Sequence, residues 1–128
     1  MTEVEVVEAI YEAMHAGDIG RLFELIDPEF VVTQDSRLPW GGRFEGHDGF
    51  AAFGLALRGA IESKVTIEAI FTADGDVIQM GWTRGRTLAG DTPFDIAEVH
   101  RWTIRDGRAV AAHFTIDTPA MLAALGQA

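Results

Sequence analysis

Residues 93–116, PFDIAEVHRWTIRDGRAVAAHFTI, decide the fold of this chain. Two β-prone runs, 93–104 and 108–116, flank the turn Arg105-Asp106-Gly107. An Asp-Gly pair between two such runs is a strong sequence signal for a β-hairpin. The segment therefore predicts two antiparallel strands joined by a tight turn.

The same pattern extends toward the N-terminus of this hairpin. Residues 64–72 and 77–87 form two further β-prone runs, and compact turns at 73–76 and 89–92 connect them to each other and to the hairpin. Consecutive hairpins predict antiparallel order. Runs of about ten residues exceed the usual strand length of about 5 to 6, which favours a strongly coiled sheet.

Helices are predicted before these strands. Thr2 and Glu5 have the spacing of a capping box, and apolar residues at helical spacing follow until Gly17. Asp18 is the predicted cap of a second, shorter helix that ends at Pro28. The two helices are expected to form a hairpin.

The middle of the chain and its C-terminal end contain shorter signals. Residues 30–33 are β-prone, and residues 34–42 form a predicted loop rich in turn formers. Gly46-His47-Asp48 opens a third helix whose apolar stripe runs to Ile61. Thr118-Pro119 places a capping residue before a first-turn proline and predicts a short terminal helix.

These elements together predict an α+β fold. A cone-shaped, curved antiparallel sheet is expected to pack against the three helices of the N-terminal half and to enclose a pocket. A small-molecule site is expected between the helices and the sheet. With 128 residues, 48% of them hydrophobic and 23% charged, the chain has the size and composition of a single globular domain spanning residues 1–128.

Charge and composition argue against several classes of partner. Ten Lys and Arg against twenty Asp and Glu give a net charge of −10, which repels phosphate backbones and anionic lipid surfaces, so neither nucleic acid nor membrane is an expected partner. The acidic N-terminal residues lack the features of a secretory signal, and the expected location is cytoplasmic. The chain has no cysteine, which excludes disulfides, thiolate metal sites and a cysteine nucleophile.

Five motifs, in this order along the chain, resemble a known family. They are Ala16-Gly17-Asp18, PWGGRFEG at 39–46, DGDV at 74–77, HRWTIRDGR at 100–108 and DTPAML at 117–122. The set is similar to the SnoaL-like branch of the nuclear-transport-factor-2-like superfamily, which includes ketosteroid isomerases and polyketide cyclases. The resemblance covers nearly the whole chain and implies the fold. It does not imply one activity, because the family also includes hydrolases and dehydratases.

Asp35 and Asp117 are candidate catalytic acids through this resemblance. Asp35 is similar in position to the proton-shuttling aspartate of ketosteroid isomerases, and in an apolar cavity its pKa would rise. The alternative is an Asx-type turn residue or a partner for Arg37. Asp117 matches the acid–base aspartate at the end of the last strand in SnoaL-like cyclases. Alternatively, Asp117 only stabilises the start of the terminal helix.

His100 is the third catalytic candidate. Strict alternation places Glu98, His100, Trp102 and Ile104 on one face of their strand, which we expect to line the cavity. The resemblance places His100 where isomerases carry an oxyanion-stabilising aspartic acid, and a neutral imidazole can donate the same hydrogen bond. The alternative is a buried histidine satisfied by Glu98 or by a tyrosine.

Tyr11 and several large side chains are candidate substrate-binding residues. Tyr11 is the only tyrosine, and it lies one residue from the position of the isomerase tyrosine. Either its helix rotates to compensate, or Tyr11 packs in the core with its hydroxyl at the edge. Glu98 is the polar member of the proposed lining. The expected apolar walls of the pocket are Trp40, Phe53, Trp82 and Trp102.

The predicted chemistry requires no metal or cofactor. No pair of histidines has the i,i+4 spacing of a helical zinc site, and no glycine-rich loop has the context of a phosphate cradle. We expect a cofactor-independent isomerase or cyclase type of enzyme that performs acid–base chemistry next to a carbonyl of a small apolar ligand. The alternative is a non-catalytic ligand-binding or dimeric interaction domain. Under either hypothesis a homodimer through the outer face of the sheet is expected.

Overall fold

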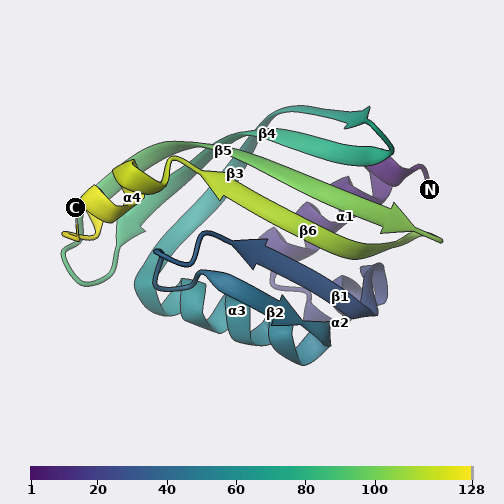
Figure 1. The fold of residues 1–128 in the computed structure, drawn as a ribbon, viewed down its shortest axis with the longest axis horizontal. Helices are drawn as coiled ribbons and strands as arrows, with labels where there is room; N and C mark the ends of the chain where they lie inside the picture. The colour runs from purple at the N-terminus through teal and green to yellow at the C-terminus, as the bar shows by residue number, and fades with distance from the viewer. Residues whose placement is uncertain (128) are drawn as a thin grey trace.

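The computed structural model describes residues 1–127 and forms a mixed α+β fold. Helices and strands occur in this order: α1 (Glu3–Ala16), α2 (Ile19–Leu25), β1 (Ile26–Gln34), β2 (Gly42–Glu45), α3 (Gly46–Ala60), β3 (Ile61–Ala73), β4 (Asp76–Thr87), β5 (Pro93–Arg105), β6 (Arg108–Ile116) and α4 (Thr118–Ala124). Figure 1 shows the long strands crossing the molecule, with the helices gathered along one side and α4 at one end. The predicted fold class is confirmed.

One curved sheet contains all the strands. Its six strands lie in the order β2-β1-β6-β5-β4-β3, and the pairs β3–β4, β4–β5 and β5–β6 are the predicted antiparallel hairpins. The pair β1–β6 is parallel, so the expectation of a purely antiparallel sheet is wrong at this one place. The two strands can run in the same direction because α3 and four other strands separate them in the chain.

Turn chemistry explains two of the hairpins. Asp74 and Gly75 both have positive φ, at 54° and 82°, and Asp106 and Gly107 have φ of 52° and 77°. Two consecutive positive φ values are the requirement of a type I′ turn, whose twist matches that of the flanking strands. The two Asp-Gly pairs therefore fix the registers of β3–β4 and β5–β6.

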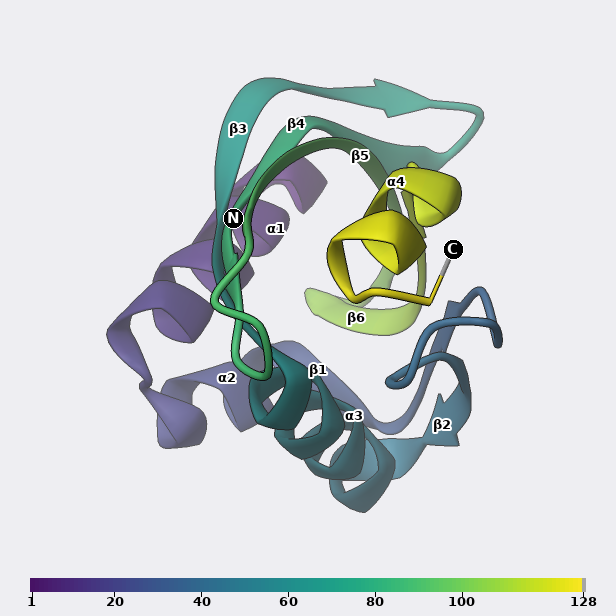
Figure 2. The same cartoon turned by 90° about the vertical axis from the view of Figure 1, so that its left-hand side faces the viewer.

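The sheet is strongly curved, and glycine permits the curvature. A Cβ atom at Gly81 or Gly85 of β4 would overlap the carbonyl oxygen of Thr66 or Glu62 on β3. Only a residue without a side chain allows the two strands to approach this closely. Viewed end-on, the strands bend around α4 (Figure 2).

The segment between α2 and α3 differs from its prediction. α2 ends at Leu25, and Pro28 lies inside β1 instead of ending the helix. Pairing of β1 with β6 is interrupted between Ile26 and Val31, and a proline is tolerated at such an irregularity because it cannot donate to the ladder. β2 was not predicted; its four residues pair antiparallel with the end of β1.

The helices cover one face of the sheet. α1 contacts β3 to β6, α2 contacts β1 and β6, and α3 contacts β1, β2 and β3. The predicted capping box is present, with Glu5 N–H donating to Thr2 Oγ1 at 3.1 Å and Thr2 N–H donating to Glu5 Oε1 at 2.8 Å. The terminal helix is confirmed, although its cap is Asp117 and not Thr118. No helix within residues 1–127 is long and apolar enough to cross a membrane.

Candidate functional site

The inner face of β5 carries two titratable side chains into the core. Burial alternates along this strand, and the buried positions are Phe94, Ile96, Glu98, His100, Trp102 and Ile104. The predicted shared face of Glu98, His100, Trp102 and Ile104 is confirmed. A buried carboxyl and a buried imidazole need hydrogen-bond partners, and three elements supply them.

Tyr11 of α1 is at the centre of these contacts. Its hydroxyl lies 2.6 Å from His100 Nδ1, and it accepts hydrogen bonds from Trp102 Nε1 at 3.0 Å and Gln79 Nε2 at 3.1 Å. Tyr11 is only 2% exposed, so the alternative of a hydroxyl at the edge of the core is wrong. Burial raises the pKa of Tyr11 above its ordinary value, which keeps the phenol protonated.

The hydrogen-bond partners fix the position of each proton. Two N–H donors occupy both lone pairs of the Tyr11 oxygen, so its own hydrogen points to His100 Nδ1. Burial lowers the pKa of His100 to about 3, which makes the imidazole neutral at neutral pH. Its hydrogen is therefore on Nε2, which donates to Glu98 Oε2 at 3.2 Å.

Gln79 of β4 completes this group, which we call the buried cluster: Tyr11, Gln79, Glu98, His100 and Trp102. Gln79 is fully buried and pairs with His100 in the β4–β5 register. Its amide nitrogen donates to Glu98 Oε2 at 3.0 Å as well as to Tyr11. With Glu98 ionised and the other members neutral, every polar hydrogen of the cluster is therefore used inside the cluster.

Two buried oxygens of the cluster have no partner. Gln79 Oε1 and Glu98 Oε1 are buried and receive no hydrogen bond. Such an unpaired acceptor costs about 1 to 3 kcal/mol. Burial raises the pKa of Glu98 to about 7, although the hydrogen bond from Gln79 acts in the opposite direction. Glu98 can therefore exchange a proton near neutral pH, and its Oε1 is the atom free to do so.

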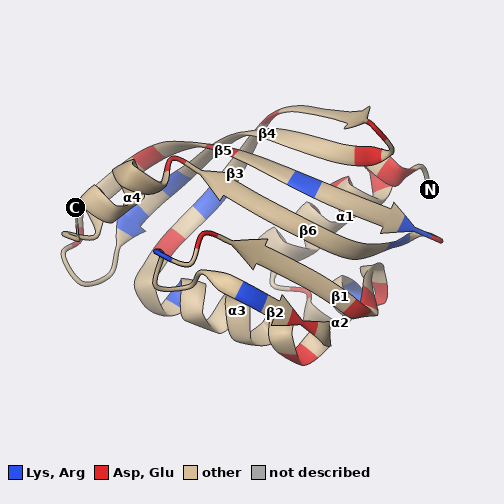
Figure 3. Cartoon of the chain, in the orientation of Figure 1, with Lys and Arg blue, Asp and Glu red and all other residues tan. Residues whose placement is uncertain are grey.

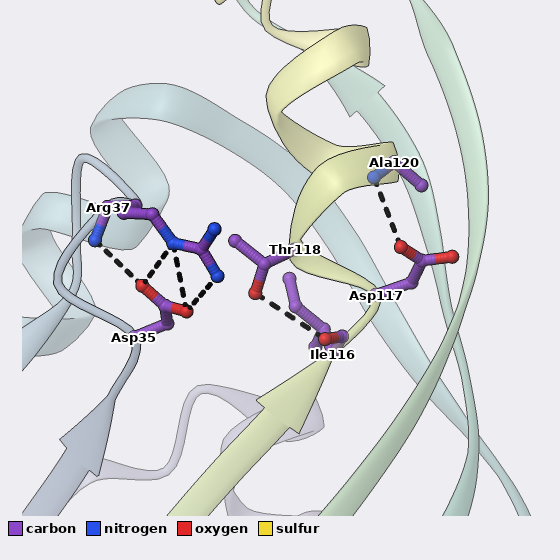
Figure 4. A network of polar contacts seen from close by, with 6 residues as sticks. All are labelled: Asp35, Arg37, Ile116, Asp117, Thr118 and Ala120. Carbon is purple, nitrogen blue, oxygen red and sulfur yellow. Dashed lines mark hydrogen bonds and ion pairs between the residues drawn. The ribbon is translucent and has the colours of Figure 1, made fainter. Parts of the chain in front are cut away.

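Asp35 lies outside this cluster, in the loop after β1. Its carboxylate accepts hydrogen bonds from Arg37 Nε at 3.1 and 3.2 Å, from Arg37 Nη2 at 2.7 Å and from Arg37 N–H at 2.9 Å (Figure 4). These bonds hold the pKa of Asp35 at about 2. The expectation of a raised pKa is wrong, and the alternative of a turn residue paired with Arg37 is confirmed.

A pocket opens at the C-terminal ends of β1 and β6, and we call it the mouth pocket. It measures about 380 Å³ and brings together two of the predicted catalytic residues, Asp35 and Asp117. Its lining is Asp35, Arg37, His113, Phe114, Thr115, Ile116, Asp117, Thr118 and Pro119. Asp117 Oδ1 caps α4 by accepting from Ala120 N–H at 3.2 Å (Figure 4), as the helix-start alternative predicts. His100, the third candidate, does not line this pocket.

A second pocket of about 640 Å³ lies away from both groups, at the start of β1 and the β5–β6 turn. Its lining contains none of the predicted site residues: Asp27, Glu29, Arg105, Asp106, Arg108 and Val110. No cluster of three or more His, Asp or Glu side chains within residues 1–127 has the arrangement of a metal site.

The model of the SnoaL-like domain family matches residues 7–112 of the chain. This chain belongs to the SnoaL-like domain family. The resemblance seen in the sequence motifs is thereby confirmed. A search of curated proteins gives no match.

Solved structures share the fold over nearly the whole length of this SnoaL-like chain. An NTF2-like protein of unknown function from Burkholderia pseudomallei K96243 is 23% identical, with a TM-score of 0.88 and 98% of each chain covered. TerC, co-crystallised with polyporic acid, is 21% identical with a TM-score of 0.88, covering 98% of this chain and 99% of its own. A hypothetical protein with a ketosteroid isomerase-like fold from Catenulispora acidiphila DSM 44928, in complex with trimethylamine, is 20% identical with a TM-score of 0.76, covering 97% of this chain and 94% of its own.

The predicted apolar walls of the SnoaL-like pocket fall into two groups. Trp40, Phe53 and Trp102 are buried, and Trp40 Nε1 donates to Gln34 Oε1 at 3.1 Å. Trp82 pairs with Ala97 on the outer face of the sheet, where its Nε1 donates to Glu68 Oε2 at 3.2 Å. Trp82 therefore cannot line the interior, because its neighbours Gly81 and Thr83 are buried on the inward face and alternation places Trp82 on the other face.

Gln79 is the functional candidate that sequence reasoning missed. It lies at a polar position between apolar Val77 and small Gly81, on the inward face of β4. Counting pairs outward from a turn at residues 88–91, which places Thr87 opposite Thr92, gives the pair Gln79–His100. A glutamine at an inward strand position opposite a buried histidine is the signal that identifies it.

Proposed function

We propose that this chain is a cofactor-independent acid–base enzyme that moves a proton next to a carbonyl of a small, mostly apolar ligand. One observation carries the proposal. Glu98 has a buried, unpartnered Oε1 and a pKa of about 7, and a general acid or base works best when its pKa is near the operating pH. The role of proton carrier therefore moves from Asp35, where the resemblance suggested it, to Glu98.

The other members of the buried cluster are proposed to position Glu98. His100 Nε2 and Gln79 Nε2 both donate to Oε2, so the carboxylate is held by one oxygen while the other is free. Tyr11 donates to His100 Nδ1 and thereby fixes the imidazole tautomer that serves Glu98. In the proposed reaction Glu98 takes a proton from the carbon beside the carbonyl and returns it to another atom of the same ligand.

The ligand class follows from the walls around the cluster. Phe114 lies 4.2 Å from the His100 ring and 5.4 Å from the Trp102 ring, centroid to centroid. Phe53 and Phe30 extend the same aromatic layer. Such surroundings favour a flat, apolar ligand with few polar atoms. The TerC structure with polyporic acid supports this class, because it has the same fold.

Asp35 and Asp117 are proposed to contact the outer end of the ligand in the mouth pocket. The low pKa of Asp35 makes it a weak base, and Asp117 Oδ1 is occupied by the α4 cap. Both carboxylates can still accept hydrogen bonds from ligand hydroxyl groups. We therefore assign them to binding and Glu98 to proton transfer.

The test measures proton movement on model ketones. β-Tetralone in D₂O reports exchange beside a carbonyl by NMR, and a β,γ-unsaturated cyclic ketone reports isomerisation by its gain in ultraviolet absorbance. Glu98→Gln keeps the shape of the side chain and is expected to lower either rate about 100-fold or more. Glu12→Gln, an exposed change on α1, is the matched control and should leave the rates unchanged. An active Glu98→Gln variant would remove Glu98 from the mechanism.

One observation favours a second candidate function, ligand binding without turnover. The Glu98 side chain is completely covered, and both ring nitrogens of His100 already have hydrogen-bond partners within the core. This is the arrangement of a buried histidine with a purely structural role. Under this hypothesis an apolar ligand is retained through purification chemically unchanged, and native mass spectrometry detects it. Conversion of that ligand on incubation would rule out the binding hypothesis.

We also propose that the chain forms a homodimer through the outer face of the sheet. Phe71, Met80 and Val99 are exposed there by 42%, 42% and 37%, and Met80 and Val99 are cross-strand partners. Beyond Arg108, β6 carries no Lys, Arg, Asp or Glu (Figure 3). The ion pair Arg84–Asp95 on the same face offers both signs of charge, so a second copy related by a two-fold axis finds complementary groups.

A further inference from the structure

Phe114 belongs to two regions of the molecule at once. It lines the mouth pocket, and its ring packs on His100 of the buried cluster at 4.2 Å. The strand register gives the reason, because Phe114 of β6 pairs with Gln34 at the end of β1 and with His100 of β5. The Phe114 ring therefore lies between the pocket that contains Asp35 and Asp117 and His100 of the cluster, while Ile116, which also lines the pocket, is the cross-strand partner of Glu98.

The packing of Phe114 makes its ring the partition between these regions. Phe114 is 6% exposed, and its ring also lies 5.7 Å from Phe53 and 5.4 Å from Trp102. Behind it His100 retains a side-chain exposure of 10%, whereas Glu98 retains none. Phe114 therefore packs against the one of these two side chains that keeps any exposure.

Phe114 can move at a lower cost than the polar side chains near it. Its ring has no polar atom, so a change of rotamer breaks no hydrogen bond. In contrast, moving Tyr11 or Trp40 would break hydrogen bonds to His100 or Gln34. The neighbours of Phe114 are themselves aromatic rings, and aromatic rings pack favourably in several relative orientations. A rotated Phe114 ring can therefore still pack against them.

We propose that Phe114 is the gate through which a ligand passes from the mouth pocket to Glu98 and His100, and that its ring limits the size of the ligand that enters. Rotation of the ring joins the two regions into one cavity with Asp35 and Asp117 at the outer end and Glu98 at the inner end. The role of this gate in catalysis rests on the proposed function. The accessibility of His100 to a reagent does not depend on that function, so it can be measured separately.

The test uses diethyl pyrocarbonate, which reacts with unprotonated imidazole, on the full chain at neutral pH. Mass spectrometry of peptides gives the modification rates of His100 and of half-buried His47, whose Nε2 is hydrogen bonded to Ile26 O at 2.8 Å. The ratio of the two rates separates local opening near His100 from general loosening of the fold, because loosening raises both rates and His47 stacks on Phe23 and not on Phe114.

Phe114→Ala is expected to raise this ratio about tenfold, since it removes the partition and leaves the rest of the wall. Phe30→Ala is the matched control: it deletes the same ring from the same aromatic layer, but Phe30 does not line the mouth pocket. Phe114→Leu, a milder change, should give a smaller rise in the same direction and serves if the alanine variant does not fold. An unchanged ratio in both Phe114 variants, or an equal rise in Phe30→Ala, would overturn the gate.

Discussion

Glu98 and His100 are in contact, and burial raises the pKa of Glu98 but lowers the pKa of His100. Burial raises the pKa of Glu98 from 4.5 to about 7, so between these pH values the folded chain holds a proton that the unfolded chain has lost. Its contribution to stability therefore falls as pH rises through that window. Burial lowers the pKa of His100 from 6.5 to about 3, so its contribution rises with pH between those values.

The two contributions oppose each other between about pH 4.5 and 6.5, which gives a prediction for stability. The free energy of unfolding of the native chain should be nearly constant across this range. In Glu98→Gln only the histidine contribution remains, so the free energy should rise by about 2 kcal/mol from pH 4.5 to 6.5. Urea unfolding at several pH values measures both curves. Parallel curves for the two proteins would contradict the assignment.

Tyr11 joins the cluster to α1, and its hydroxyl gives a second prediction at this scale. Tyr11→Phe leaves Trp102 Nε1 without its partner, leaves His100 Nδ1 with only a 3.4 Å contact to Gln79 Nε2, and removes one partner of Gln79 Nε2. We expect a loss of about 3 kcal/mol in the free energy of unfolding, because the groups left unpaired are buried. Trp82→Phe removes one half-exposed hydrogen bond and should cost about 1 kcal/mol or less. Equal losses measured in urea would show that the buried hydroxyl is not special.

Sequence reasoning succeeded at residues whose environment is set locally. Alternation along β5 placed Glu98, His100 and Trp102 on one inward face, because strand geometry depends only on neighbouring residues. Sequence reasoning left open whether Asp35 lies in an apolar cavity or pairs with Arg37, and the structure shows the pair. The sequence could not decide, because Arg37 turns back onto the carboxylate and only the rotamers of both residues determine the contact.

At the scale of elements, the predictions failed where long-range pairing determines the structure. β1 begins at Ile26, where a helix was predicted, because Ile26 pairs with Ala109 of β6, about eighty residues later in the chain. β2 has only four residues and exists through its pairing with β1. The hairpins of β3 to β6 were predictable because their turns and alternation lie within the segment itself.

The close contact of β3 and β4 gives a prediction for two glycines. Gly81→Ala places a Cβ against the Thr66 carbonyl, and forcing the strands apart should cost about 2 kcal/mol in stability. Gly59→Ala in α3 meets no atom within 4 Å and should gain about 0.5 to 1 kcal/mol, because alanine favours helix. Thermal unfolding of the two variants compares them directly. Tolerance of alanine at Gly81 would mean that β3 and β4 can separate freely.

For the whole molecule, the outer face of the sheet combines exposed apolar side chains with ion pairs. Arg101–Asp76 and Arg86 with Glu62 and Asp91 lie toward the ends of the strands, at 2.5, 3.0 and 2.9 Å. Met80 and Val99 lie between them at the middle of β4 and β5. An apolar centre with a charged rim is the typical composition of a protein–protein interface.

This arrangement predicts a dimer that a single charge can disrupt. Val99→Glu places a carboxylate at the apolar centre, next to its own copy across a two-fold axis, and should increase the dissociation constant about 100-fold or more. Leu55→Glu on α3, exposed by 69%, is the matched control and should leave association unchanged. Sedimentation velocity over a concentration series measures both. A native chain that sediments as a monomer at all concentrations would contradict the dimer, while the buried cluster, which lies within one chain, would be unaffected.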